Sequence, residues 1–375
     1  MTDPIFIDND SDLARACATW AGCETIAVDT EFERTRTYYS RPALVQIFDG
    51  ARAALIDPLA VGDFSPLARV LAQAETLKVM HAAEGDLEVL EQLTGVVPGP
   101  LFDTQIAAAL AGHGFSLGYR QLTHMLEGVE LAKDETRSNW LERPLAEAQV
   151  AYAVRDVLHL LALHRRLEND LAELGRQAWL DEENARLERR RRMDRDPRRA
   201  YLRIRAPANL DVEQLSALRE LAAWREREAR ARDLPRRRIL DDSGLLRIAS
   251  ALPSDAAALA THDELTEKFL ARYAGAIVDA VATARAAGAG SPPEQRPLLD
   301  RRHAPWLKAL KEVVRRRASS LGLPEPVLAQ SRTLEAMVQA AAENRAQLPD
   351  ELHGWRRAVI GEALMTKLEA LAGGR

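Results

Sequence analysis

Four acidic residues and one tyrosine have the types and spacings that a metal-dependent site requires. Asp29 and Glu31 are two residues apart in a segment typical of a β-strand, so strand alternation places both carboxylates on one face. Asp86 opens a predicted helix after a later strand, a connection at which α/β sheets often bind ligands. Tyr152 and Asp156 are spaced i, i+4 in a helical segment and therefore share one helix face.

The chemistry that such a set would serve is phosphodiester hydrolysis with two metal ions. Carboxylates that lie close together repel one another unless a cation lies between them. Magnesium and manganese prefer oxygen ligands, and two such ions can activate a water and stabilise the leaving oxygen. Tyr152 would place the attacking water through a hydrogen bond, because a phenol with an ordinary pKa of about 10 is a donor at neutral pH.

Each of these features also has a structural explanation. An Asp-x-Glu pair after a strand is more often a turn or cap, and an Asp that opens a helix is by default its N-cap. The Tyr152 and Asp156 pair would by default be a tertiary hydrogen bond. Asp103 is a competing acid that we interpret as the cap of the helix after it, and we interpret His81 as a hydrogen-bonded core residue. The joint occurrence of the four acids and the tyrosine, in this order, favours catalysis.

The elements that must position these residues predict a mixed α/β first half. Strands at 25–29, 44–48 and 53–56 are too close in sequence for crossover helices, so we expect an antiparallel meander. A strand at 77–81 follows a helix and pairs in parallel with the first strand. Asp29 and Glu31 are expected at the end of the first strand, and residues 144–175 form one long helix, straight or bent. Further helices are expected at 65–73, 84–93 and 104–111.

The second half reads as helical throughout. After a charge-dense connector, helical periodicity covers 210–231, 244–252 and 265–287, and a Gly/Pro linker at 288–297 precedes a second helical unit. Both units contain a basic helix followed by a Leu-Pro turn, which suggests a duplicated module. The predicted domains are a catalytic domain at 1–175, a basic helical connector at 176–207, and helical domains at 208–290 and 298–375.

Composition narrows the class of protein. In 375 residues, 47% are hydrophobic and 29% are charged, which is ordinary for a globular protein, and no apolar run reaches the length of a membrane span. The N-terminus lacks the pattern of a signal peptide, so we expect a cytoplasmic protein. Two cysteines, Cys17 and Cys23, argue against a disulfide framework and against a thiolate zinc site.

Charge is divided unevenly along the chain. Residues 1–180 contain 27 acids and 15 lysines and arginines, whereas residues 181–375 contain 29 acids and 36 lysines and arginines. An acid-rich region that holds metal, joined to a basic region that binds nucleic acid, would give this division. Chance variation between domains is the alternative.

At these residues the sequence resembles the DEDD exonuclease superfamily, in its tyrosine-bearing branch. The segment VDTEF at 28–32 matches the first motif, HAAEGDLEVL at 81–90 the second, and YAVRDV with Tyr152 and Asp156 the third. The stretches at 31–39, 44–50 and 133–145 are more specifically similar to the bacterial ribonuclease D family. Residues 210–290 resemble an HRDC domain, and residues 298–372 resemble a second, more divergent copy.

The resemblance implies a fold and an activity. The fold would be a ribonuclease H-like exonuclease domain with a mixed sheet, followed by two small all-α domains of HRDC type. The activity would be that of a 3′-to-5′ exoribonuclease that releases nucleoside 5′-monophosphates and trims the 3′ ends of tRNA precursors and other structured RNA, working as a monomer away from membranes. The carried-over roles give two Mg²⁺ or Mn²⁺ ions to Asp29, Glu31, Asp86 and Asp156, with Tyr152 positioning the nucleophile. The second helical domain lacks the Asp-x-Pro turn, which leaves open whether it touches RNA or braces the first.

Substrate contacts are expected just past the first carboxylates. The candidates are Thr30, Phe32, Arg36, Tyr38 and Tyr39, with an arginine fork on phosphate and a tyrosine stacked on the terminal base. The alternative is that Tyr38 and Tyr39 pack against the sheet edge. Two other functions keep part of this interpretation: a DNA exonuclease, since no residue announces a contact to the 2′-hydroxyl, and a catalytically silent RNA-binding adaptor.

Overall fold

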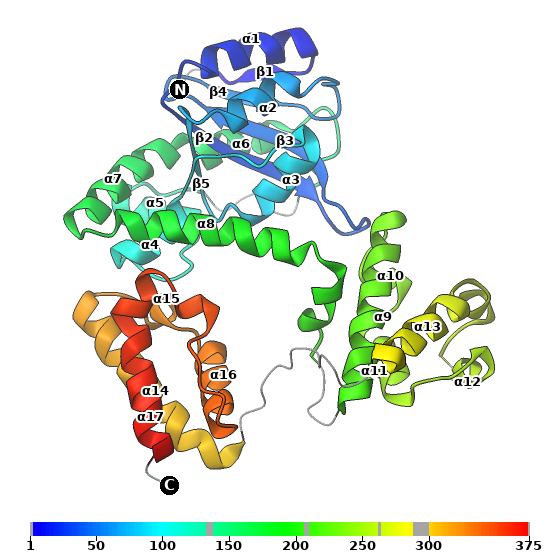
Figure 1. The fold of residues 1–375 in the computed structure, drawn as a ribbon. Helices are drawn as coiled ribbons and strands as arrows, with labels where there is room; N and C mark the ends of the chain where they lie inside the picture. The colour runs from blue at the N-terminus through cyan, green and yellow to red at the C-terminus, as the bar shows by residue number, and fades with distance from the viewer. Residues whose placement is uncertain (1–2, 133–137, 206–209, 262–263, 288–299, 374–375) are drawn as a thin grey trace. The chain divides into compact units, whose positions relative to one another are not determined.

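The computed structural model describes residues 3–132, 138–205, 210–261, 264–287 and 300–373 (Figure 1). The predicted linker at 288–297 lies outside these residues. The chain divides into two compact units: a first unit of residues 1–33, 40–187 and 299–375, and a second unit of residues 34–39 and 188–298. Among the described residues, no helix combines the length and the apolar character needed to cross a membrane. The predicted domain limits remain predictions.

A six-stranded mixed sheet forms the centre of the first unit. Its order is β1-β4-β3-β2-β5-β6, and its strands are Ile5–Ile7, Thr25–Glu33, Arg41–Phe48, Ala53–Ile56, Leu77–Met80 and Leu101–Asp103, numbered β1 to β6 along the chain. The β2/β3 and β3/β4 pairs are antiparallel, which confirms the predicted meander. The β2/β5 pair is parallel, also as predicted, and β5 pairs in parallel with β6. The sheet therefore has the mixed pairing that was predicted.

One strand boundary was wrong. β2 does not end at the acids but continues to Glu33, with a bulge between Glu31 and Phe32. The physical reason is its partner, because β3 begins at Arg41 and pairs with β2 along this whole length. Asp29 and Glu31 are thus held inside a paired strand, which fixes their backbone more firmly than a strand end would.

Helices cover both faces of this sheet. Ile26 and Val28 of β2 join the hydrophobic cluster of α1 (Asp10–Trp20), α2 (Ser65–Ala72) and α3 (Glu84–Thr94). Ala27 faces the other way and packs with α4 and α7. Asp29 and Glu31 share the parity of Ala27, so they lie on that second face. The helices after α3 are α4 Thr104–Ala111, α5 Tyr119–Glu127, α6 Glu147–Leu158 and α7 Leu160–Glu173.

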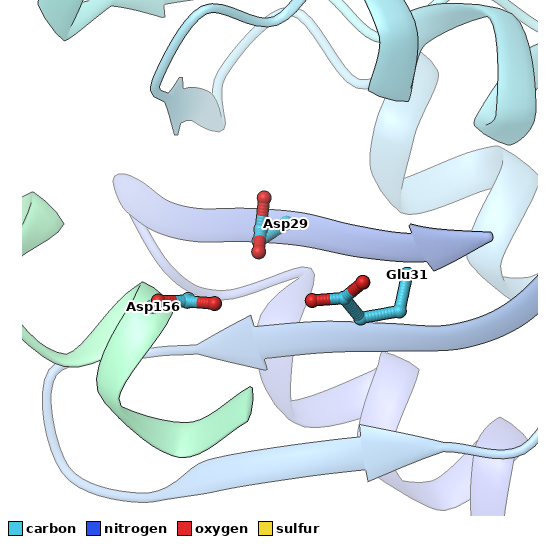
Figure 2. Close-up of side chains that lie close together, drawn as sticks. All are labelled: Asp29, Glu31 and Asp156. Carbon is cyan, nitrogen blue, oxygen red and sulfur yellow. The ribbon is translucent and has the colours of Figure 1, made fainter. Parts of the chain in front are cut away.

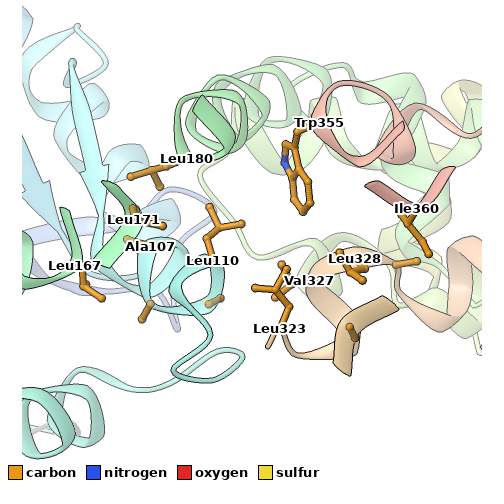
Figure 3. Close-up of a cluster of buried hydrophobic side chains, with 14 of the residues drawn as sticks. Ala107, Leu110, Leu167, Leu171, Leu180, Leu323, Val327, Leu328, Trp355 and Ile360 are labelled. Atoms are coloured by element: carbon orange, nitrogen blue, oxygen red, sulfur yellow. The ribbon is translucent and has the colours of Figure 1, made fainter. Parts of the chain in front are cut away.

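The C-terminal helices pack against the same unit. Leucines of α4 and α7 share one hydrophobic cluster with Leu323, Val327 and Trp355, as Figure 3 shows. The buried Arg176 donates to the carbonyls of Leu110 and Leu321, which lie at the last turns of α4 and α14. The helices are α8 Gln177–Asp194, α14 Ala304–Leu321, α15 Glu325–Leu328, α16 Ser331–Ala342 and α17 Glu362–Gly373, with short turns at Arg301–His303, Asp350–Leu352 and Arg357–Gly361. In the part of the chain that the structure describes, these helices share a core with the sheet domain, and not with the first helical domain, which belongs to the second unit.

The second unit has a hydrophobic core of its own. Its long helices α9 (Val212–Ala231) and α13 (Glu267–Ala287) pack around Trp224 and Tyr273. The remaining elements are η1 Pro197–Arg203, α10 Arg236–Ile239, α11 Asp242–Ala251 and α12 Ala256–Ala260. The Leu-Pro turn before α10 follows Asp233 at φ 48°, and the one before α15 follows Gly322 at φ 63°. In both halves a long helix, a left-handed residue, a Leu-Pro turn and a four-residue helix occur in the same order, which supports duplication.

Candidate active site

Three of the predicted acids come together at the centre of the sheet. Asp29 and Glu31 project from β2 and Asp156 projects from α6, so that their carboxylates point toward one another (Figure 2). One ligand oxygen from each lies within 4.8 Å of the others. This is the spacing at which a shared cation would replace mutual repulsion by attraction.

The segment that precedes α6 fixes this helix over the sheet. Arg143 donates to both carboxylate oxygens of Asp57, at 2.6 and 2.7 Å, and to the Ala43 carbonyl at 2.7 Å. At the start of α6 the side chain of Gln149 accepts from the Ala146 amide and donates to the Asn139 carbonyl. Two short connections therefore hold the helix that carries Asp156. Residues 133–137 of the predicted 133–145 stretch lie outside the described residues.

Asp86 reaches the site by a different route. It is the third residue of α3, and its carboxylate accepts a hydrogen bond of 2.6 Å from the Thr30 hydroxyl. It is not the N-cap of its helix, because that position belongs to Ala83. Thr30, a predicted substrate contact, is 5% exposed and is occupied by this bond. The fourth acid thus lies outside the group of three but within reach of their charges.

Burial raises the pKa of all four acids, and for Asp29, Glu31 and Asp156 repulsion within the group adds to it. Burial, and then the charges of the other three, raise the pKa of Asp29 well above its ordinary value. Burial followed by the charges of Asp156 and Asp86 raises the pKa of Glu31 to about 8. Burial raises the pKa of Asp156 to about 7 against a hydrogen bond from Tyr152, and that of Asp86 to about 6 against the bond from Thr30. These carboxylates ionise together only at a cost that a bound cation would remove.

The donor set fits a hard divalent cation. All the converging ligands are carboxylate oxygens, the type that magnesium and manganese prefer over nitrogen or sulfur. Gln46 lies on β3 directly opposite Asp29, fully buried, and its amide has no hydrogen-bond partner among the described residues. Sequence reasoning missed Gln46, although a lone polar residue in the apolar run Leu44–Phe48 was a signal that could have identified it.

Tyr152 lies beside Asp156 as the i, i+4 spacing predicted. Its ring packs against Trp140 with centroids 5.9 Å apart. Burial, followed by the charges of Asp156, Glu31 and Asp29, raises the pKa of the phenol above its ordinary value. The hydroxyl is therefore protonated at neutral pH and acts as a hydrogen-bond donor.

The two competing residues have structural roles. The Asp103 carboxylate accepts from the amides of Gln105 and Ile106 and caps α4, as predicted. It also accepts from the Ala82 and Ala83 amides ahead of α3. The ring nitrogens of His81 meet Thr104 Oγ1 at 2.9 Å and the Leu117 carbonyl at 3.1 Å, which confirms a hydrogen-bonded core histidine.

The remaining substrate candidates are divided between the two units. Phe32 packs beside Gly85, where an added Cβ would lie 3.4 Å from its ring. Arg36, Tyr38 and Tyr39 belong to the second unit. There the Tyr38 hydroxyl donates to Glu226, and the Tyr39 amide donates to Asp233 at 2.9 Å. Tyr38 is thus part of a polar cluster with Glu226 and Arg230 of α9.

Comparison with known families agrees with this division of the chain. The family model described as 3′-5′ exonuclease matches residues 4–172, and the model described as HRDC domain matches residues 214–281. The first match contains all four acids and Tyr152. The second covers α9 to α13, apart from their outermost residues.

Curated relatives and a solved structure match nearly the whole chain. Ribonuclease D of Pseudomonas paraeruginosa is 39% identical over 97% of both chains. Ribonuclease D of Xanthomonas oryzae is 38% identical over 92% of this chain and 93% of its own. The crystal structure of Escherichia coli RNase D, described as an exoribonuclease involved in structured RNA processing, superposes with a TM-score of 0.86 at 32% identity, covering 98% of this chain and 99% of that one.

Proposed function

The chain belongs to the ribonuclease D family of 3′-to-5′ exoribonucleases, and from that premise we propose that it trims 3′ ends of tRNA precursors and other structured RNA with two bound divalent ions. The products would be nucleoside 5′-monophosphates, and a monomer would suffice. The observation that carries the proposal is the group formed by Asp29, Glu31 and Asp156, whose carboxylate oxygens lie within 4.8 Å of one another.

The four acids would share the metal ions. Asp29, Glu31, Asp86 and Asp156 would hold the ions between them. The chemistry that the ions supply when bound is activation of a water and neutralisation of charge on the leaving oxygen. The raised pKa values of Glu31 and Asp156, about 8 and about 7, support this assignment, because cation binding would return both groups to their charged form.

Tyr152 would orient the reacting groups. Its phenol is protonated at neutral pH, since burial and the neighbouring carboxylates raise its pKa. A protonated phenol cannot act as a general base, so its contribution is a hydrogen bond that holds the water or the scissile phosphate in line for attack. The Trp140 ring beside Tyr152 restricts where that hydroxyl points.

The basic half of the chain would supply phosphate affinity. Residues 181–375 carry 36 lysines and arginines against 29 acids. Arg237 and Arg238 on α10 are exposed, whereas Arg236 is engaged with Glu226. Arginine at such positions contacts phosphate in a salt-dependent manner that is independent of base sequence. Phe32, Arg36 and Tyr39 remain predicted substrate contacts.

The test is trimming of an end-labelled, tRNA-like RNA with a short 3′ tail. Reactions would contain magnesium, manganese or chelator, beside a matched DNA substrate and the Asp156→Ala variant. We expect stepwise shortening of the RNA from its 3′ end, lost with chelator and in the variant, and nucleoside 5′-monophosphates as products. RNA that binds and stays intact in every lane would overturn the proposal, and equal cleavage of the DNA would remove the preference for RNA.

A further inference from the structure

The helix that carries Asp156 is interrupted three residues beyond it. α6 ends at Leu158 and α7 begins at Leu160, so the single helix predicted for this region is broken at His159. His159 has φ −96° and ψ −7°, away from ideal helical values. Sharp changes in a helix generally have a local cause, such as proline or a side chain inserted between the hydrogen-bonding groups. No proline occurs in residues 145–196, so the cause lies elsewhere.

Tyr119 provides that cause. It is the first residue of α5, and its phenol hydroxyl donates to the Arg155 carbonyl at 2.8 Å and accepts from the His159 amide at 3.2 Å. In an unbroken helix these two main-chain groups, four residues apart, would bond to each other. The hydroxyl bridges them instead, so one direct bond is replaced by two and the turn that contains Asp156 is held open.

The tyrosine is itself held in place from two sides. The Thr123 hydroxyl donates to the Tyr119 carbonyl at 2.9 Å. The Tyr119 ring meets the His81 ring with centroids 5.7 Å apart and planes at 61°, and His81 is fixed by Thr104 and Leu117. The tyrosine ring thus contacts His81, which follows β5 and is bonded in turn to Thr104 at the start of α4.

We propose that Tyr119 is a positioning residue for Asp156, and that its inserted hydroxyl sets where the Asp156 carboxylate lies relative to Asp29 and Glu31. The inference rests on the proposed function, which makes Asp156 a metal ligand. Groups that orient metal ligands without touching the metal commonly change its affinity when they are altered. Without the hydroxyl, the His159 amide would bond directly to the Arg155 carbonyl. The turn between them would then tighten and shift the Asp156 carboxylate.

The test compares two variants that each lose one hydroxyl. Tyr119→Phe keeps the ring and removes the bridge, whereas Thr366→Val removes a hydroxyl that bonds the Glu362 carbonyl one turn earlier in α17. Manganese binding would be measured by calorimetry without RNA, together with the manganese concentration for half-maximal trimming and the KM for RNA at saturating manganese. We expect Tyr119→Phe to weaken manganese binding about tenfold and to raise the half-maximal concentration alike, with KM unchanged. Thr366→Val should change none of the three.

Asp156→Ala separates the possible failures. If Asp156→Ala loses tight manganese binding while Tyr119→Phe binds as the wild type does, the role of Tyr119 is wrong and the metal site stands. If Asp156→Ala binds manganese normally, the proposed metal site itself fails. Should Tyr119→Phe melt below the assay temperature, the same titrations would be made on all variants at a temperature below its melting transition. Normal binding by a folded Tyr119→Phe, or an equal loss in Thr366→Val, overturns the inference.

Discussion

Glu226 in the second unit and Glu31 in the first are both withdrawn from solvent, yet their pKa values depart from 4.5 in opposite directions. Burial acts to raise the pKa of Glu226, but hydrogen bonds from Arg236 and Tyr38 and the charge of Arg230 lower it to about 2. For Glu31, burial is reinforced by the charges of Asp156 and Asp86, and the pKa rises to about 8. Arginine side chains compensate the charge of Glu226, whereas Glu31 is surrounded by other acids.

The charges that surround a buried acid distinguish a structural acid from a functional one. The Glu226 carboxylate meets Arg230 at 3.0 Å and Arg236 at 2.9 Å, so its charge is satisfied within the fold. Among Asp29, Glu31 and Asp156, by contrast, the fold leaves most of the mutual repulsion of the carboxylates uncompensated. Such an arrangement costs stability, and it persists where a ligand of opposite charge repays the cost, so strongly raised acid pKa values mark candidate functional sites.

We expect the largest effect from removing one carboxylate charge from the group formed by Asp29, Glu31 and Asp156. Asp156→Asn keeps the shape of the side chain, and we expect it to slow RNA trimming roughly 10⁴-fold, the scale on which essential catalytic groups act. In chelator, its melting temperature should not fall, because one source of repulsion is gone. Rates on labelled RNA and thermal melts would be compared with the wild type. A variant that trims normally, or that melts markedly lower without metal, would erase the contrast with Glu226.

The same chemical change in the second unit should do the reverse. Glu226→Gln leaves the partly exposed Arg230 and Arg236 without the buried carboxylate charge that they share, and we expect it to lower the free energy of unfolding by about 3 kcal/mol. Urea titrations monitored by tryptophan fluorescence would measure the loss. Glu228→Gln is the matched control, because Glu228 pairs with Arg232 at the partly exposed surface and should cost below about 1 kcal/mol. Equal losses in the two variants would mean that the Glu226 cluster is not a buried ion pair in energetic terms.

A tyrosine hydroxyl lies beside an acid at each of the two sites, Tyr152 beside Asp156 and Tyr38 beside Glu226. Tyr152→Phe removes the hydroxyl next to Asp156, and we expect trimming to slow about 100-fold, as when one well-placed hydrogen-bond donor is lost from an active site. Calorimetry should show manganese binding retained, because the carboxylates are untouched. An unchanged rate would make Tyr152 a structural residue, and lost manganese binding would make it a support for the metal site.

Stability should depend on pH in opposite senses at the two sites. The raised pKa of Glu31 means that the folded state keeps a proton which the unfolded state loses near 4.5, so metal-free protein should lose stability as pH rises from about 4.5 to about 8. The lowered pKa of Glu226 contributes stability that is present above 4.5 and is lost as pH falls toward about 2. Melting curves in chelator and in manganese test both. Manganese should flatten the loss of stability between pH 4.5 and about 8 and leave the loss below pH 4.5 unchanged. If manganese does not affect the loss above pH 4.5, the metal assignment is contradicted.

The sequence indicated that Asp29, Glu31 and Asp156 would act together because much of their geometry is local. The two-residue spacing of Asp29 and Glu31 and the four-residue spacing of Tyr152 and Asp156 fix their faces once the strand and the helix are assigned. The mixed sheet was predictable for the same reason, since short gaps between strands exclude crossovers. The extension of β2 to Glu33 was not, because it depends on where β3 begins.

What the sequence could not provide were contacts between residues distant in the chain. The Thr30 hydroxyl reaches Asp86 across 56 residues, and the Tyr119 hydroxyl reaches Arg155 across 36. No periodicity encodes either contact, since each depends on how α3 and α5 are placed against other elements. The joining of residues 299–375 to the first unit is of the same kind, because a shared core shows in the sequence only as two sets of apolar residues.

The smallest expected effect decides between two interpretations of Tyr38. Its hydroxyl donates to Glu226 and accepts from Arg230 and Arg236, and the guanidinium of Arg236 lies 4.8 Å from its ring centroid. If this is its whole role, Tyr38→Phe should lower the free energy of unfolding by about 1 kcal/mol, the net worth of a hydrogen bond, and should leave KM for RNA unchanged. A base stacked on Tyr38 would need the ring and not the hydroxyl, so Tyr38→Leu should then raise KM while Tyr38→Phe does not. Steady-state trimming by both variants distinguishes the two roles. The guanidinium of Arg236 lies over the Tyr38 ring, so a base could stack there only after Arg236 moves away.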